Sequence, residues 1–171
     1  MKRVLAIVLS AVMARGDVVK IGVFEPQTGE NGGGGLQEVY GIRYANQQFP
    51  TVKVGDKEYK IELVEADNKS DKTEAVTAAQ SLISAGCSVI LGSYGSGVSI
   101  AAGEIFSDAQ VPAIGCSCTN PQVTLGNDFY YRVCFLDPFQ GTVMANYAAQ
   151  DGAKTAAVIT QPVSYTHLTL P

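Results

Sequence analysis

Three segments rich in glycine and hydroxyl side chains each follow a short apolar run of this sequence. They span residues 25–35, 92–97 and 117–120. Glycine lets a ligand approach backbone N–H groups closely, and serine or threonine adds a hydrogen-bond donor or acceptor. Such groups suit the recognition of a carboxylate or an ammonium by hydrogen bonds, and they do not suit acid–base chemistry. The sequence therefore predicts a small-molecule binding site rather than a catalytic centre.

A serine nucleophile is the enzymatic alternative, and the spacing disfavours it. The hydrolase elbow G-x-S-x-G is absent, because Leu91 and Tyr94 stand two residues before Ser93 and Ser96. The single histidine, His167, falls in an end segment that we interpret as non-native, so no base is at hand. We therefore expect no enzyme and no catalytic residue. An N-cap role for Ser96 is compatible with contact to a ligand.

Cofactor and metal chemistry find no matching motif. Residues 32–35, four glycines that we interpret as a loop, match neither G-x-G-x-x-G nor G-K-[ST]; close approach to a ligand and a plain flexible turn both stay open for them. Cys116-Ser117-Cys118 is neither a C-x-x-C pair nor a zinc knuckle. We expect no metal and no cofactor. The four cysteines can be small buried thiols, or two of them can form a disulfide in an exported protein, and the sequence does not select a pair. They are Cys87, Cys116, Cys118 and Cys134.

Composition indicates a globular chain without a nucleic-acid partner. Of the 171 residues, 46% are hydrophobic and 16% are charged, which provides for one sizeable core. The net charge is −4, and lysine and arginine are scattered rather than clustered.

Apolar runs alternate with amphipathic stretches along the chain, which predicts strands alternating with helices. Strands are expected at residues 20–24, 61–64, 89–91, 111–116, 130–133 and 155–160, with a small hairpin at 52–59. Helices are expected at 36–48, 71–86, 98–106 and 137–150. This order implies right-handed βαβ units and a parallel sheet covered on both faces, an α/β fold. Because the carboxyl ends of parallel strands meet at one edge, the three glycine- and hydroxyl-rich segments converge there.

Two carboxylates near the second core strand have structural interpretations. Asp71 and Glu74 have the spacing of a capping box that opens a helix. We interpret Asp67 and Asp71 as helix-entry and solvated residues rather than as a catalytic pair.

Both ends of the chain have a distinct character. Residues 1–14 show the basic start and short apolar run of a secretory signal peptide, with an apolar first strand as the alternative; the run is too short to span a membrane. Residues 163–171, VSYTHLTLP, break the preceding pattern and look like the translation of a transposon mosaic end. We interpret them as a construction scar on a truncated reading frame.

An ordered series of segments covers residues 20–160: KIGVFEPQTGENGGGG, YGIRYANQ, DNKSDKTEAVTAAQSLISAG, VILGSYGSGVSIAAGEIFSDAQVPAIGCSCTNPQVT and FYYRVCFLDPFQGTVMANYA. In this series the sequence resembles the substrate-binding proteins of branched-chain amino acid ABC importers, of the type I periplasmic-binding (Venus-flytrap) fold. The resemblance implies an incomplete N-terminal ligand-binding lobe at residues 15–136, then a crossover and the start of a second lobe at 137–162. Because closure on a ligand needs both lobes, we expect this chain alone to be poorly stable and to bind weakly.

The resemblance also implies a ligand and its contacts. Ser96, with the N–H of Gly97, would bind an amino acid carboxylate, and the segment Ser117, Cys118 and Thr119 would supply a carbonyl and a hydroxyl to the ammonium and carboxylate. We expect Ser96 to face Thr119. An aromatic side chain of the first loop often covers the pocket in relatives, and residues 32–35 take its place here.

The biological setting follows from the same resemblance. The protein would be an exported monomer, periplasmic or extracellular and associated with the cell surface. It would pass a small amino acid or amide to an ABC permease. The alternative is a ligand-sensing domain of a receptor or regulator on the same fold.

Overall fold

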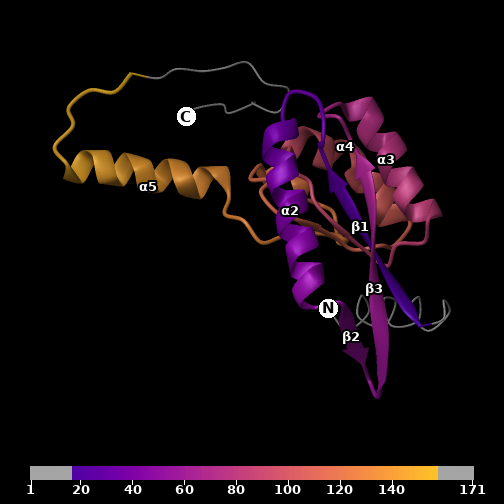
Figure 1. The fold of residues 1–171 in the computed structure, drawn as a ribbon. Coiled ribbons are helices and arrows are strands. Elements are labelled where there is room, and N and C mark those ends of the chain that lie inside the picture. Colours follow the sequence, from indigo (N-terminus) through magenta and orange to yellow (C-terminus); the bar gives the residue numbers. More distant parts are fainter. Residues whose placement is uncertain (1–16, 158–171) are drawn as a thin grey trace.

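The computed structural model describes residues 17–157, and Figure 1 shows its ribbon. A sheet lies between helices, and the α/β fold predicted from the alternation of strands and helices is confirmed. The expected signal peptide, residues 1–14, and the expected scar, residues 163–171, lie outside the described residues. So does half of the strand expected at 155–160. Residues 155–157, which are described, are not in a strand.

Six strands form the sheet of the described part, in the order β2-β3-β1-β4-β5-β6. They are β1 (Val18–Glu25), β2 (Thr51–Val54), β3 (Lys57–Asp67), β4 (Val89–Leu91), β5 (Ala113–Gly115) and β6 (Tyr130–Arg132). Neighbouring strands are parallel, except that β2 runs antiparallel to β3 in the expected hairpin. The chain passes from β1 to β3 on one side and returns to β4 on the other. In open α/β sheets, ligands bind at the carboxyl ends of strands where the order reverses in this way.

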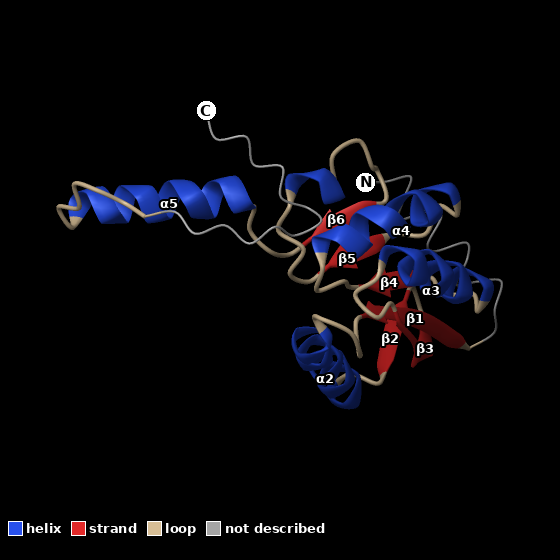
Figure 2. Cartoon of the chain, turned by 90° about the horizontal axis from the view of Figure 1, so that it is seen from above, coloured by secondary structure: helices blue, strands red, loops and turns tan. Residues whose placement is uncertain are grey.

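Helices cover both faces of the sheet. They are α2 (Gly32–Gln48), α3 (Lys72–Ser84), α4 (Ser96–Asp108), the short 3-10 helix η1 (Pro121–Val123) and α5 (Asp137–Gln150). Figure 2 shows α2 on one face and α3 and α4 together on the other. The larger core lies under α3 and α4. There the Phe24 and Phe106 rings meet edge to face with centroids 5.5 Å apart, and the Tyr130 ring lies 6.1 Å from that of Phe106. These aromatic contacts hold β1 and β6 against α4.

The first turn of α2 consists of the four glycines, so the expectation that residues 32–35 form a loop is wrong. A Cβ on Gly35 would lie 2.0 Å from the carbonyl oxygen of Pro26. A Cβ on Gly34 would lie 2.5 Å from the ring of Tyr94. The glycines therefore let the start of α2 pack directly against the segments that follow β1 and β4.

The rest of α2 covers its face of the sheet thinly. Of the residues that predicted the helix, Val39 is fully buried and Leu36 is half-buried, whereas Tyr40 and Tyr44 are 57% and 64% exposed. The smaller number of buried side chains here contrasts with the packed core under α3 and α4.

Helix α5 lies where the sequence predicts a helix, and none of its residues is buried. Figures 1 and 2 show it projecting from the sheet. The assignment of residues 137–162 to a second lobe stays a prediction. In the part of the chain that the structure describes, no helix combines the length and hydropathy required to cross a membrane.

Candidate ligand-binding edge

The carboxyl ends of β4 and β5 bring the predicted ligand residues to one edge of the sheet. The hydroxyl oxygen of Ser96 accepts a hydrogen bond from the backbone N–H of Asn120 at 3.3 Å. Because Asn120 directly follows Thr119, the start of α4 and the segment after β5 are in contact, as expected from the sequence. The ligand-binding roles themselves stay predictions for Ser96, Gly97, Ser117, Cys118 and Thr119.

Ser96 is the first residue of α4 rather than its cap. The N-cap is Gly95, and no side chain caps the helix, so the cap prediction is wrong by one residue. The Ser96 residue is 6% exposed, and its hydroxyl reaches the neighbouring segment instead. The first turn of α4 contains no acidic side chain. Its N–H groups and the positive end of the helix dipole therefore favour an anion at this edge.

The three residues after Cys116 present different groups to the edge. The Cys118 side chain is fully buried, and its Sγ lies 2.1 Å from where a Cβ on Gly115 would be. Cys118 can therefore offer a ligand only its backbone. The Ser117 hydroxyl donates a hydrogen bond to Glu38 Oε1, and the carbonyl of Thr119 accepts one from a backbone N–H at 3.1 Å.

All four cysteines lie in the described part of the chain, and all are free thiols. Cys87 and Cys118 are buried, and the other two are half-buried. Of the two alternatives that the sequence left open, the structure shows thiols rather than a disulfide.

Arg132, at the end of β6, holds the segment that follows β5. Its guanidinium donates hydrogen bonds to the carbonyls of Cys118 at 2.7 Å, Asn120 at 2.9 Å and Pro121 at 3.3 Å, and to Thr124 Oγ1 at 2.8 Å. Sequence reasoning missed this role. The available signal was a basic residue at the end of a short strand, beside a segment that needs its carbonyls satisfied.

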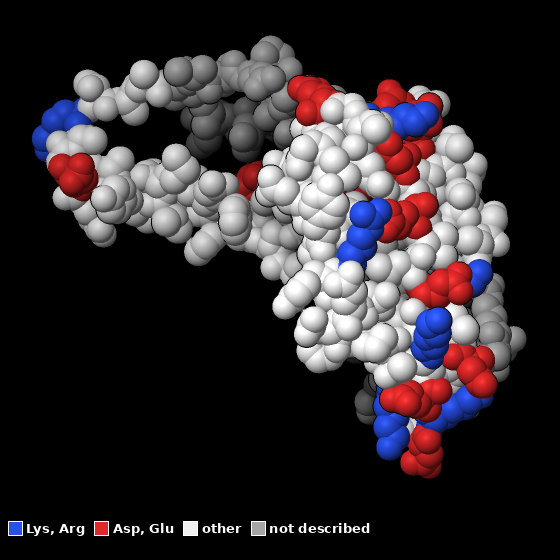
Figure 3. All heavy atoms as spheres, in the orientation of Figure 1, with Lys and Arg blue, Asp and Glu red and all other residues white. Residues whose placement is uncertain are grey.

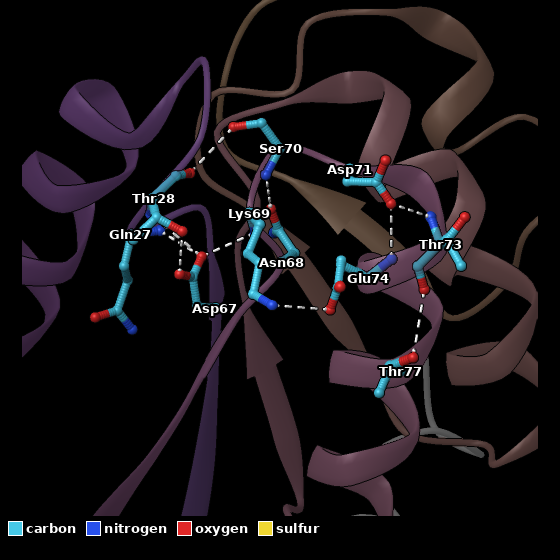
Figure 4. A network of polar contacts seen from close by, with 10 residues as sticks. All are labelled: Gln27, Thr28, Asp67, Asn68, Lys69, Ser70, Asp71, Thr73, Glu74 and Thr77. Atoms are coloured by element: carbon cyan, nitrogen blue, oxygen red, sulfur yellow. Dashed lines mark hydrogen bonds and ion pairs between the residues drawn. The ribbon is translucent and has the colours of Figure 1, made fainter.

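Asp67, at the end of β3, holds the loop after β1. Figure 4 shows its carboxylate facing that loop, and Asp67 Oδ1 accepts hydrogen bonds from the backbone N–H groups of Gln27 at 2.8 Å, Thr28 at 3.3 Å and Lys69 at 2.8 Å. The Thr28 hydroxyl donates to Oδ2 at 2.6 Å. Burial raises the pKa of Asp67, but these hydrogen bonds outweigh it and lower the pKa below its ordinary value. The carboxylate is therefore a structural anchor for the loop.

The capping prediction is confirmed for the side chain of Asp71, whereas the Asp71 N–H donates to the carbonyl of Asn68 at 3.0 Å and not to Glu74, as a full capping box requires. The Asp71 side chain accepts hydrogen bonds from the N–H groups of Thr73 and Glu74, at 2.8 and 2.9 Å. The Glu74 carboxylate pairs with Lys69 at 3.3 Å. Asp71 thus caps the helix, as Figure 4 also shows, and it belongs to no catalytic pair with Asp67.

Replacement of Asp67 by asparagine is expected to lower the free energy of unfolding by about 1–2 kcal/mol, because the amide cannot accept all the bonds that the carboxylate accepts. Since the folded-state pKa of Asp67 is lowered, its contribution is present above its ordinary pKa and is lost as pH falls. Urea unfolding at pH 7 and in acid measures both effects. Asp56→Asn, in the exposed hairpin turn, is the control. Equal midpoints for the Asp67 variant and wild type would contradict the prediction.

Two acidic side chains that the sequence analysis did not single out lie beneath this edge. Glu25, the last residue of β1, is 0% exposed, and its Oε2 accepts a hydrogen bond from the backbone N–H of Tyr94 at 2.7 Å. Glu38, on α2, accepts the bond from Ser117. One carboxylate oxygen of Glu25, one of Glu38 and the sulfur of Cys116 lie within 4.8 Å of one another. The signal in the sequence was a glutamate that ends a strand of buried apolar residues.

The aromatic residue at this edge comes from an unexpected segment. Tyr94 follows β4 and is 42% exposed, and its ring occupies the space that a side chain at position 34 would fill. Gly34, in the first turn of α2, leaves room for this ring. The ring of Tyr94 therefore packs against the start of α2.

Surface charge around the sheet is mixed. Figure 3 shows acidic and basic side chains interspersed on one face, and the ion pairs include Arg43 with Glu65 at 2.7 Å and Lys20 with Glu62 at 3.7 Å. A pocket of about 370 Å³ lies at the opposite edge of the sheet, where β1 and β4 begin, and it contains none of the predicted ligand residues.

Comparison with known proteins identifies relatives of this chain. An "Amino acid binding protein" of Pseudomonas aeruginosa is 35% identical over 172 residues, which cover 96% of this chain and 46% of the relative. A "Leu/Ile/Val-binding protein homolog 1" of Brucella abortus is 31% identical over 148 residues, which cover 82% and 39%. The chain thus spans less than half the length of these curated relatives.

Solved structures resemble the fold. The leucine binding protein LivK of Thermotoga maritima has a TM-score of 0.72 and 40% identity, over 78% of this chain and 37% of that one. LivJ of Streptococcus pneumoniae, a branched-chain amino acid transporter substrate binding protein solved with isoleucine, has a TM-score of 0.69 and 29% identity, over 78% and 38%. The family described as "Periplasmic binding protein" matches residues 18–170, and the chain belongs to that family.

Proposed function

We propose that this chain is the N-terminal part of an exported solute-binding protein that captures a small amino acid, branched-chain or of similar size, or a small amide, for an ABC importer. It acts by binding and without catalysis, as a monomer at the periplasmic or outer face of the membrane, and it has no nucleic-acid partner. The names of the relatives support an amino acid as the ligand.

The contact between Ser96 and the Thr119–Asn120 segment carries this proposal. It joins a helix N-terminus to hydroxyl and carbonyl groups at one sheet edge. In this arrangement Ser96 and the N–H of Gly97 receive the ligand carboxylate, since a helix N-terminus favours an anion. The hydroxyl of Thr119 and the backbone of Ser117 and Cys118 receive the ammonium and the second carboxylate oxygen. The partly exposed ring of Tyr94, which packs against Gly34 and stands two residues before Ser96, would add an apolar wall.

Titration of the full-length parent protein with the twenty amino acids and simple amides by calorimetry tests the proposal. Ser96→Ala is expected to weaken binding of the best ligand about 10- to 100-fold, since a hydrogen bond to a charged group contributes about 1.5–3 kcal/mol. Ser81→Ala, at an exposed position on α3, is the control and should bind as wild type does. If no amino acid or amide binds the parent, or if Ser96→Ala binds unchanged, the proposal is wrong.

A further inference from the structure

The carboxyl groups of Glu25, which is buried, and Glu38, which is half-buried, lie within 4.8 Å of each other beneath the proposed ligand edge. Glu25 and Glu38 each use one oxygen to accept a hydrogen bond, from the N–H of Tyr94 and the hydroxyl of Ser117 respectively. Their other oxygens, Glu25 Oε1 and Glu38 Oε2, are buried and have no hydrogen-bond partner in the described part of the chain. Both atoms are acceptors when ionised, so a donor is required between them.

A proton supplies this donor most simply. Two adjacent carboxylates that are shielded from water cannot both be ionised without a cation. The groups that act on Glu25 are Glu38, the N–H of Tyr94 and the hydroxyl of Ser93, and none is a cation. Burial, reinforced by Glu38, raises the pKa of Glu25 from 4.5 to about 10. Glu25 is therefore a neutral acid at pH 7, and its O–H can donate to Glu38.

The pair also connects the segments of the edge. Glu25 ends β1 and binds Tyr94, which precedes α4, while Glu38 on α2 binds Ser117, which follows β5. Asn68, at the end of β3, donates to Ser93 at 3.0 Å and extends the same buried polar network. A hydrogen bond between the two carboxyl groups thus joins the elements that carry Ser117 to those that carry Tyr94.

We propose that Glu25 and Glu38 share one proton and that this shared proton positions the segments of the ligand edge, so that loss of the proton at alkaline pH loosens the edge and weakens ligand binding. The part that concerns binding rests on the proposed function. The part that concerns the edge does not, because it is measured without ligand. Both glutamates are positioning residues and touch no ligand.

The surrounding groups do not titrate in the same range. Burial raises the pKa of Cys116 and of Tyr130, and it raises that of Cys118 to about 11, so these groups stay neutral. Asp67, which pairs with Glu25 in the sheet register, has a lowered pKa and stays ionised. Arg132 donates to backbone carbonyls and a threonine hydroxyl.

The direction of the pH dependence follows from linkage. Because the folded-state pKa of Glu25 lies above its ordinary value of 4.5, the fold takes up a proton there. The contribution of the pair is fully present below about pH 4.5 and declines as pH rises toward 10. The contribution of Asp67 to stability changes in the opposite direction, because it is lost as pH falls. The pH ranges in which Asp67 and Glu25 change the free energy of unfolding are therefore separate.

Chemical unfolding of this chain without ligand at pH 6 and pH 9 tests the shared proton. The wild-type midpoint should fall markedly between the two pH values, and Glu104→Gln, at an exposed position on α4, should fall in parallel. Glu25→Gln should show a nearly flat profile, because its amide donates to Glu38 at every pH. Parallel profiles for wild type and Glu25→Gln would overturn the proposal.

Three further measurements keep the test decisive. If Glu25→Gln does not fold, infrared spectroscopy of the wild-type protein at pH 7 tests the proposal instead. The band of a protonated carboxyl group is expected, and its absence overturns the proposal. A midpoint that zinc chloride raises in wild type but not in Glu25→Gln would also overturn it, because a metal ion would then join Glu25, Glu38 and Cys116. In the full-length parent, ligand affinity should change little up to pH 9 and should fall about tenfold more in wild type than in Glu25→Gln by pH 11, which is one unit above the pKa of about 10 of Glu25. If no ligand binds while the unfolding profiles differ as expected, the proton stands and the proposed function fails.

Discussion

Replacing Arg132 by methionine is expected to lower the free energy of unfolding by about 3 kcal/mol or more, because each hydrogen bond from a charged group contributes about 1.5–3 kcal/mol. Methionine fills much of the same volume but leaves three carbonyls of the segment after β5 without this donor. In the parent protein we expect ligand binding to be lost as well, since the same segment carries Thr119. Urea unfolding and calorimetry measure the two effects.

Two other variants separate geometry from charge. Arg132→Lys keeps the charge but cannot reproduce the planar fork, so we expect about half of the loss. Arg43→Met removes an exposed arginine that pairs with Glu65, and exposed ion pairs contribute only about 0–1 kcal/mol. If Arg132→Met were as stable as Arg43→Met, the proposed role of the guanidinium would be wrong.

Alanine substitutions in the glycine run are expected to have opposite signs at neighbouring positions. Gly35→Ala should lower the free energy of unfolding by about 2–3 kcal/mol, because the new Cβ would lie 2.0 Å from a backbone oxygen of the buried Pro26. Gly33→Ala meets no heavy atom within 4 Å and should raise stability by up to about 0.5–1 kcal/mol, since alanine favours a helix. Thermal and urea unfolding of the two variants beside wild type measure the difference. The same sign for both would show that the first turn of α2 is not packed as described.

Local patterns in the sequence predict most of the sheet. Apolar runs locate β1, β3, β4 and β5, and the Gly55-Asp56 turn locates the hairpin, because these signals need only a few neighbouring residues. Asp71 predicts its helix start for the same reason. The convergence of Ser96 with the segment after β5 follows from parallel topology alone.

Contacts between distant parts of the chain were beyond such reasoning. The bond between Ser117 and Glu38 spans 79 positions, and that between Tyr94 and Glu25 spans 69. No periodicity records such pairs. The glycine run is an α-helix although glycine disfavours helices, because close packing against Pro26 and Tyr94 overrides that tendency.

The exposed face of α2 has a similar explanation. Tyr40 and Tyr44 share one helix face with Val39 by their spacing, yet only Val39 of this helix has a fully buried large side chain. The later turns of α2 lie on a face of the sheet where few side chains are buried, so both tyrosines stay exposed. Spacing gives the face of a helix but not the depth at which it packs.

The reversal of strand order at β1 has a consequence for how such proteins diversify. Helix α2 lies on one face of the sheet, and α3 and α4 lie on the other. The groups proposed to recognise a solute lie in short connections after the strands, whereas the aromatic contacts of the core join the strands to α4. Exchange of a few residues in these connections can therefore retune chemical preference without rebuilding the scaffold. For the same reason, the fold can serve as a scaffold in which the connections after the strands are replaced by other binding loops.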